Sequence, residues 1–235
     1  PKTLLPYQVY RHELGTDPAK DQLVYEEKDD SFYMGIGRTR DDRYITIGVD
    51  STVSSELRYT SAANPGEFTV LAKRERDVEY DADHFDGRWV IRTNADGAKD
   101  FKIMQTPVTA PGRENWTEVV PHRPGTLILN HMAFARHLVW LERHEGLPRI
   151  VVRDRMSGEE HAIAFAEEAY SLGLSGAAEY DTDVIRFSYS SMTTPSRSSS
   201  VRTRSTTACR AYSNAVSGRP DCFLRRLGRV RWHHW

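Results

Sequence analysis

The nearest approach to a catalytic motif in this sequence is a serine flanked by glycines, Gly173-Leu174-Ser175-Gly176-Ala177. Acyl transfer by serine needs a nucleophile exposed on a strained turn between a strand and a helix, written G-x-S-x-G. Here glycine stands at a variable position and alanine replaces the final glycine. No alternation of strands and helices surrounds the segment. It therefore predicts a turn rather than a nucleophile.

Metal and cofactor motifs are also incomplete. His12-Glu13 begins like a zinc-protease motif, but Thr16 stands where the second histidine ligand is needed, so we interpret it as a strand fragment. Gly35-Ile36-Gly37 lacks the third glycine and the following helix of a dinucleotide fingerprint, so it is read as part of a strand.

The other candidate ligands have no ligand spacing. The two cysteines, Cys209 and Cys222, cannot form a disulfide scaffold and lack the clustered partners of a zinc site. His233-His234 is a weak metal signal. The remaining histidines are scattered: His84, His122, His131, His137, His144 and His161. We therefore predict no catalytic residue, no cofactor-binding residue, no metal ligand and no cofactor.

Composition places the chain among soluble globular proteins. Its 235 residues are 39% hydrophobic and 28% charged, and no apolar run approaches the roughly 18 to 20 residues of a membrane helix. The start, residues 1–6, has no signal-peptide hydrophobic region, so we expect a cytoplasmic protein with no membrane partner.

The net charge of −1 conceals a division within the chain. Residues 197–235 hold nine arginines and a single acid, Asp221, for a net charge of +8, which leaves −9 on residues 1–196. The acidic runs, such as Glu26-Glu27-Lys28-Asp29-Asp30, are typical of solvated turns. They also suggest long-range attraction of cationic peptides.

Short alternating segments rich in β-branched and aromatic residues dominate residues 1–196. In the segment 44–49, Ile45, Ile47 and Val49 fall on one face of a strand because side chains alternate with period two. Asp, Gly, Asn and Pro clusters separate the segments, and Asp96-Gly97 marks a turn. The pattern predicts an all-β fold.

These segments recur in groups of four. Ile45, Val90, Val139 and Ile185 stand at equivalent places, separated by steps of 45, 49 and 46 residues. One four-stranded antiparallel propeller blade uses about 40 to 50 residues. We predict a partial unit (7–28), whole units (31–74, 78–121, 125–166) and the start of another (168–196). A β-sandwich with coincidental spacing is the alternative.

Three blocks of sequence resemble a known family. The segments 3–16 (TLLPYQVYRHELGT), 23–30 (LVYEEKDD) and 189–195 (YSSMTTP) are similar to the oligopeptidase B group of the prolyl oligopeptidase family. The resemblance covers about residues 1–196. It implies a seven-bladed propeller that covers an α/β-hydrolase domain and admits short peptides to a Ser-Asp-His triad, with cleavage after Arg or Lys. In that family the triad follows the propeller, so no catalytic residue is carried over.

From Arg197 the sequence no longer predicts strands. Its Ser, Thr and Arg bias is typical of GC-rich DNA read out of frame, and we predict a frameshifted or disordered tail over 197–235 after a propeller domain over 1–196. The alternative is a basic arm for nucleic acid, in which arginines contact phosphates and aromatic residues stack on bases. The disordered reading is preferred, with no nucleic-acid partner.

The sequence thus leads to two hypotheses on function. The first is the substrate-gating propeller part of a serine oligopeptidase that acts on short basic peptides, with this chain inactive alone. The second is a stand-alone β-propeller that binds peptides or proteins without catalysis. Neither hypothesis fixes the oligomeric state.

Overall fold

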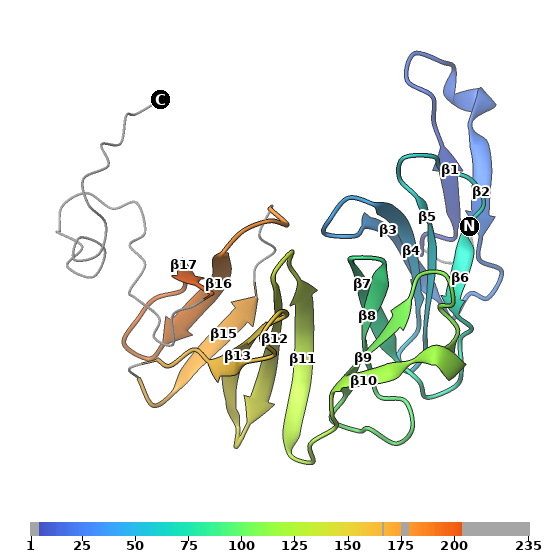
Figure 1. Cartoon of the computed structure of the whole chain (residues 1–235). Coiled ribbons are helices and arrows are strands. Elements are labelled where there is room, and N and C mark those ends of the chain that lie inside the picture. Colours follow the sequence, from blue (N-terminus) through green and yellow to red (C-terminus); the bar gives the residue numbers. More distant parts are fainter. Residues whose placement is uncertain (1–4, 166, 175–178, 204–235) are drawn as a thin grey trace.

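The computed structural model describes residues 5–165, 167–174 and 179–203. Within them the chain consists of antiparallel β-strands and two short 3-10 helices, η1 (Pro18–Lys20) and η2 (Arg113–Asn115). The strands form separate sheets that follow one another in sequence order around an open arc (Figure 1). Each sheet contains only strands that follow one another in the chain, whereas the sheets of a β-sandwich commonly contain strands that are far apart in the sequence. The predicted all-β fold of a partial propeller is therefore confirmed.

Each sheet contains strands that are consecutive in the chain. The amino-terminal hairpin comprises β1 (Gln8–Arg11) and β2 (Gln22–Glu26). Blade 1 comprises β3 (Tyr33–Arg38), β4 (Tyr44–Asp50), β5 (Ser55–Ser61) and β6 (Thr69–Ala72). Blade 2 comprises β7 (Tyr80–Phe85), β8 (Arg88–Thr93), β9 (Lys102–Pro107) and β10 (Thr117–Val120).

The two remaining sheets complete the described part. Blade 3 comprises β11 (Thr126–Ala133), β12 (His137–His144), β13 (Leu147–Asp154) and β14 (Glu160–Ala162). Blade 4 comprises β15 (Tyr170–Leu174), β16 (Val184–Ser191) and β17 (Arg197–Arg202).

Two tight turns show how the sequence fixes these hairpins. Asp86 and Gly87 join β7 to β8 with φ values of 44° and 73°, and Glu145 and Gly146 join β12 to β13 with 50° and 82°. Two successive positive φ values are those of a type I′ turn, whose twist matches antiparallel strands and which favours glycine. The registers on both sides are uninterrupted.

The core is divided among the gaps between successive sheets. One cluster, with Ile47 and Val49, packs under the hairpin, and another, with Trp89 and Ile91, lies between blades 1 and 2. A third, with Trp140, joins blades 2 and 3, and a fourth joins blades 3 and 4. Blades 2 and 3 therefore bury both faces against neighbouring blades, as propeller blades do.

The structure corrects one detail of the repeat. Ile45 and Ile185 face the preceding sheet, whereas Val90 and Val139 face the following one. Because strand side chains alternate with period two, an offset of one residue reverses the face. The residues that face the preceding sheet, as Ile45 and Ile185 do, are Trp89 rather than Val90 in blade 2 and Leu138 rather than Val139 in blade 3.

The structure also corrects the predicted end of the strand pattern. We expected it to stop at Arg197, but residues Arg197–Arg202 form β17 and pair with β16 from Tyr189↔Arg197 to Val184↔Arg202. Val201 is 5% exposed and joins the core between blades 3 and 4. Partner-strand pairing thus forms a strand where composition predicts none. The rest of the predicted tail, 204–235, lies outside the described residues.

Candidate functional site

A buried histidine and aspartate form the arrangement most like catalytic machinery. His84 lies on β7, and Asp41 lies in the turn between β3 and β4. His84 Nδ1 is 2.5 Å from Asp41 Oδ2, and the two side chains are 1% and 4% exposed. Such a pair orients the imidazole of a serine peptidase.

The other ring nitrogen shows that this pair is structural. His84 Nε2 accepts a hydrogen bond of 3.1 Å from the backbone N–H of Gly87, so the nitrogen that would take a proton from a nucleophile is occupied. Asp41 Oδ1 accepts further bonds from the Thr39 hydroxyl (2.8 Å) and the Arg43 N–H (3.2 Å). The pair therefore ties blade 1 to blade 2.

Asp83 extends this polar link to a third blade. Its Oδ1 accepts a bond of 3.0 Å from the N–H of Arg40 in blade 1, and its Oδ2 one of 3.3 Å from the N–H of Ala133 in blade 3. The Arg40 guanidinium lies 3.6 Å from Asp83 Oδ2 and 5.0 Å from the centre of the Phe134 ring. One carboxylate thus joins three successive blades.

A second histidine and aspartate join blades 2 and 3. His131 on β11 places Nδ1 3.0 Å from Asp81 Oδ1 on β7 and donates from Nε2 to the Val90 carbonyl at 3.0 Å. Arg92 donates to Asp81 Oδ2 at 2.7 Å. Burial alone would raise the pKa of Asp81, but the bond from His131 and the charges of His131 and Arg92 lower it. Asp81 is held as a carboxylate.

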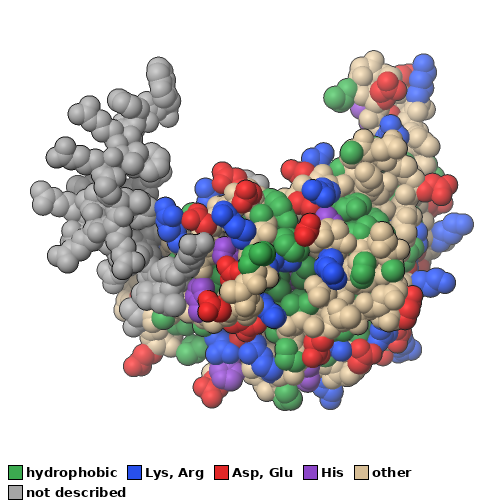
Figure 2. Space-filling model, in the orientation of Figure 1, with side chains coloured by type: hydrophobic (Ala, Val, Ile, Leu, Met, Phe, Trp, Pro, Cys, Tyr) green, Lys and Arg blue, Asp and Glu red, His purple; other side chains and the backbone are tan. Residues whose placement is uncertain are grey.

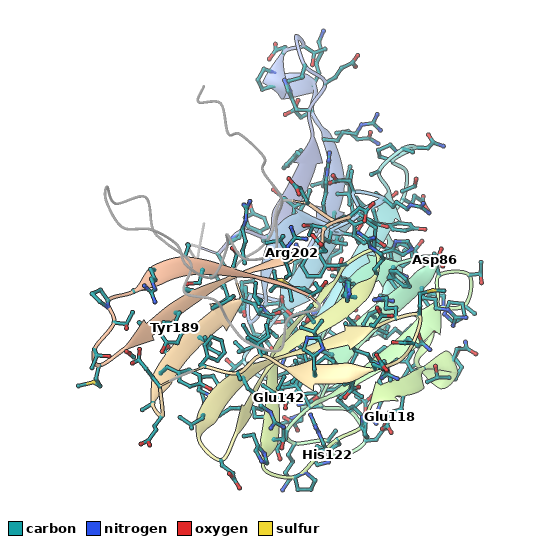
Figure 3. All side chains as sticks on the ribbon, turned by 60° about the vertical axis from the view of Figure 1, so that its left-hand side comes forward. Asp86, Glu118, His122, Glu142, Tyr189 and Arg202 are labelled. Atoms are coloured by element: carbon teal, nitrogen blue, oxygen red, sulfur yellow. The ribbon has the colours of Figure 1, made fainter. Side chains whose placement is uncertain are left out.

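Glu142 on β12 is a fully buried carboxylate whose bonds come from its own blade and one neighbouring loop. It accepts hydrogen bonds from Trp140 Nε1 (2.7 Å) and Arg149 Nε (2.6 Å), and Arg123 forms an ion pair with it. In Figure 3, Glu142, Asp86 and Tyr189 lie on separate blades and do not converge on a common point. The buried Glu142 stabilises blade 3, and the buried pair of His84 and Asp41 stabilises the interface between blades 1 and 2.

The motifs singled out in the sequence fall in strands and turns. His12 Nδ1 lies 2.7 Å from Asp21 Oδ1 across the hairpin, and Thr16 bonds to the Glu13 carbonyl. Gly35 and Gly37 lie in β3, as predicted. The first two residues of the segment 173–177, Gly173 and Leu174, are the last two of β15. Ser175, Cys209, Cys222 and His233-His234 lie outside the described residues.

Of the scattered histidines, one lies in blade 2 (His84), one in the loop before blade 3 (His122) and four in blade 3 (His131, His137, His144 and His161). Among the described residues, no group of three His, Cys, Asp or Glu side chains is placed to hold a metal ion. Within the same residues, no helix is long and apolar enough to cross a membrane.

A cavity of about 630 Å³ lies between the amino-terminal hairpin and blade 1. The apolar side chains of Leu23, Ile36 and Ile45 line much of it, with Arg11 and Glu67 at its polar part. Figure 2 shows hydrophobic side chains at several places on the described surface of the arc. Ile36 is 63% exposed and Leu23 is 43% exposed, so the cavity presents apolar side chains to solvent.

Comparison with known proteins agrees with this architecture. Residues 2–207 match the family profile described as the prolyl oligopeptidase N-terminal beta-propeller domain, which covers most of the chain. The chain belongs to the prolyl oligopeptidase family.

Its relatives in the prolyl oligopeptidase family are much longer proteins. Dipeptidyl aminopeptidase BI of Pseudoxanthomonas mexicana is 51% identical over 204 residues, which cover 87% of this chain and 28% of that protein. Protease 2 of Moraxella lacunata is 30% identical over 192 residues, 81% of this chain and 27% of that protein. The chain thus spans less than a third of these curated relatives.

Solved structures show the same fold. Oligopeptidase B from Trypanosoma brucei, solved with covalently bound antipain, superposes with a TM-score of 0.80 at 25% identity, over 85% of this chain and 30% of that one. Oligopeptidase B from Leishmania major gives 0.84 at 23% identity, over 94% and 33%. The resemblance to the oligopeptidase B group inferred from the three sequence blocks is confirmed.

Proposed function

We propose that this chain supplies part of the propeller that covers the catalytic domain of a serine oligopeptidase and limits access to short peptides. The observation that carries the proposal is the family match over residues 2–207, together with an arc of blades stacked in sequence order. A propeller assembled from such blades surrounds a central channel. In this proposal the channel admits short peptides and excludes folded proteins. We also propose that the protein is cytosolic.

We further propose that the chain is inactive alone. In the described residues, both nitrogens of the buried His84 ring have partners, and Glu142 and Asp41 are saturated with hydrogen bonds. No described serine is hydrogen-bonded to a histidine. Hydrolysis would then depend on a domain that resembles the hydrolase domain of the family.

For the substrate, we propose cleavage of short peptides after Arg or Lys. The similarity to Protease 2 and to the oligopeptidase B structures supports this choice. A second candidate is the removal of dipeptides from a free amino terminus, which the 51% identity to dipeptidyl aminopeptidase BI favours. Both candidates place a peptide bond in the same kind of active site, and they differ in whether the substrate needs a free amino group.

A pair of fluorogenic substrates distinguishes the two candidates. The enzyme is a chimera in which the segment of this chain that matches the Pseudoxanthomonas protein replaces its counterpart there. Hydrolysis of an arginyl amide with a blocked amino terminus supports cleavage after Arg without a terminal requirement. Turnover of a free Gly-Arg amide alone supports dipeptide removal. Binding of both peptides without turnover by any enzyme that contains the chain would favour the stand-alone binding module.

A further inference from the structure

Two buried histidines differ in the groups that their ring nitrogens face. A carbonyl or carboxylate oxygen only accepts, so a ring nitrogen that faces one must donate a proton, whereas a nitrogen that accepts from an N–H carries none. The side chains of His84 and His131 are 1% and 2% exposed, so water does not replace their protein partners. The contacts of each ring therefore indicate how many protons it carries.

His84 carries one ring proton. Its Nε2 accepts from the Gly87 N–H at 3.1 Å and so has no proton of its own. The single proton lies on Nδ1, 2.5 Å from Asp41 Oδ2. Two further titratable groups lie near the pair, namely Arg43, whose Nε is 3.7 Å from Asp41 Oδ2, and Tyr44, whose ring centre is 4.8 Å from that of His84. The geometry is that of a neutral imidazole.

His131 faces two acceptors instead. Its Nε2 is 3.0 Å from the Val90 carbonyl on β8, and its Nδ1 is 3.0 Å from Asp81 Oδ1 on β7. Without a proton, the Nδ1 lone pair would face the lone pairs of the carboxylate. Asp81 does not supply the missing proton, because Arg92 donates to its other oxygen at 2.7 Å and keeps it ionised. Both ring nitrogens are thus placed to donate, as in an imidazolium.

The charges around His131 favour the same state. On the elements packed around the ring, the charged groups besides Asp81 and Arg92 are Asp50, Glu79, Asp83 and Glu142, with Arg40, Arg123 and Arg149. The last three arginines pair with Asp83 and Glu142. The carboxylates left beside Asp81 are those of Glu79 and Asp50, whose pKa is raised by burial and by the charges of Asp81 and Glu79. Negative charge therefore predominates near the ring.

We propose that His131 is a buried imidazolium that fastens blade 2 to blade 3, and that this contact loosens when the ring loses its second proton. Loss of either ring proton leaves a buried acceptor, Asp81 or the Val90 carbonyl, without its donor. The apolar cluster that includes Ile128 and Trp140 still joins the blades, so they loosen rather than separate. The proposal rests on the blade contacts and not on the substrate proposed above.

The contact has one limit in acid and one in alkali. Since the pKa of Asp81 is lowered from 3.8, its carboxylate contributes above that value, and the contribution is lost as pH falls through the lowered pKa. The imidazolium contributes while it is protonated, and its contribution is lost as pH rises. The contact between blades 1 and 2 lacks this upper limit, because His84 is already neutral and burial raises the pKa of Tyr80, whose hydroxyl accepts from the Leu57 N–H at 2.8 Å.

Nitrogen-15 NMR of the histidine rings tests the proposal in the unaltered 235-residue chain, so the result does not depend on whether a variant folds. At neutral pH, His131 should show a bonded proton on both ring nitrogens, and His84 on Nδ1 alone. The variants His131→Gln and His84→Gln assign the signals, since each removes one set. A single ring proton on His131 at neutral pH would overturn the proposal.

Hydrogen exchange, corrected for the intrinsic effect of pH, tests the loosening. The Ala133 N–H reports on blades 2 and 3, because it donates to Asp83 Oδ2 at 3.3 Å, and the Leu57 N–H reports on blades 1 and 2. As pH rises from neutral to alkaline, protection of Ala133 should fall by roughly tenfold, the order expected for one hydrogen bond to a charged group, while Leu57 keeps its protection. Equal losses at both positions would contradict a change at His131.

A matched pair of variants connects the response to Asp81. Asp81→Asn removes the charge that holds the second proton, so protection of Ala133 should be lower at neutral pH and should fall no further in alkali. Asp86→Asn is the control, since Asp86 is exposed in the turn between β7 and β8, and it should keep the response of the unaltered chain. A fall in alkali that survives Asp81→Asn would also overturn the proposal.

Discussion

At the scale of single residues, buried charges in this chain are neutralised by partners in adjoining sheets. Glu27, just after β2, accepts hydrogen bonds from Arg74 Nη2 (2.6 Å), the Tyr25 hydroxyl (2.8 Å) and the Asp29 N–H (2.9 Å). Its side chain is 7% exposed. Because an unpaired buried carboxylate destabilises a fold, the ion pair between Arg74 and Glu27 should contribute a measurable free energy to the packing of the hairpin on blade 1.

Substitution Arg74→Met should lower the free energy of unfolding by about 2 kcal/mol, because it leaves the buried Glu27 without its cation, whereas Glu56 keeps its pair with Arg58. Urea denaturation at neutral pH measures the loss. Arg76→Met is the control, since Arg76 is 91% exposed and its pair with Asp77 is worth little. Equal stability of the two variants would show that the Arg74 pair does not stabilise the fold.

The same carboxylate predicts a dependence on pH. Burial alone would raise the pKa of Glu27, but the bonds from Arg74, the Asp29 N–H and Tyr25 lower it from 4.5 to about 2. A pKa lower in the folded state stabilises the fold above the unfolded value, and this contribution is lost as pH falls from about 4.5 to about 2. The stability difference between wild type and Glu27→Gln should therefore be constant above pH 5 and shrink in acid. A difference that grows in acid would contradict the assignment.

His84 gives a test of structural against catalytic roles. His84→Ala should cost about 3 kcal/mol of stability, because it opens a cavity and removes the partner of buried Asp41. In the chimera, kcat per folded molecule should stay near the wild-type value, whereas loss of a catalytic histidine costs orders of magnitude. His12→Ala, at an exposed pair, should change neither quantity.

At the scale of elements, β17 is the strand whose assignment most needs a test. Val201→Asp should destabilise the chain by about 3 kcal/mol, because it places a charge in the core between blades 3 and 4, where Val201 is 5% exposed. Ser198→Asp, on the exposed side of the same strand, should change stability by less than about 0.5 kcal/mol. Thermal unfolding of both variants gives the comparison, and equal midpoints would remove β17 from the sheet.

The strands were predictable where local pattern and partner agree. Residues 44–49 alternate apolar and polar side chains and form β4, and Asp96-Gly97 turns with φ values of 58° and 78°. The strand β17 was missed because Arg197-Ser198-Ser199-Ser200 has low strand propensity, and pairing with β16 determines its conformation. The one-residue offset of Val90 and Val139 arose because turn lengths vary between blades and sequence steps alone do not set the register.

The buried polar network was not predictable in the same way. His84 and Asp41 are 43 residues apart, and nothing in their spacing announces a contact between two blades. The same separation joins Arg40 to Asp83. The sequence correctly placed Gly35-Ile36-Gly37 in a strand, because the motif lacks the third glycine and the helix of a dinucleotide fingerprint. The strand predicted at His12-Glu13 is wrong, because β1 ends at Arg11 and both residues lie in the connection that follows it.

At the scale of the whole molecule, the negative charge of residues 1–196 predicts that salt affects the rate of an enzyme that contains them. Their net charge of −9 should attract cationic peptides, and salt should weaken that attraction as the Debye length falls from about 30 Å to about 8 Å between 0.01 and 0.15 M. For the chimera, kcat/KM for a dicationic peptide should therefore fall over this range. A neutral peptide of the same length should show little change. An unchanged rate for the dicationic peptide would exclude steering by the propeller.

The central claim is that the described residues form propeller structure, from which we propose that the chain is inactive alone. Covalent labelling by a fluorophosphonate probe tests it most directly, since such probes react with activated serine nucleophiles. The 235-residue chain should remain unlabelled under conditions in which the full-length dipeptidyl aminopeptidase BI of Pseudoxanthomonas mexicana is labelled to completion. Modification of a serine in the 235-residue chain, located by mass spectrometry, would contradict the account.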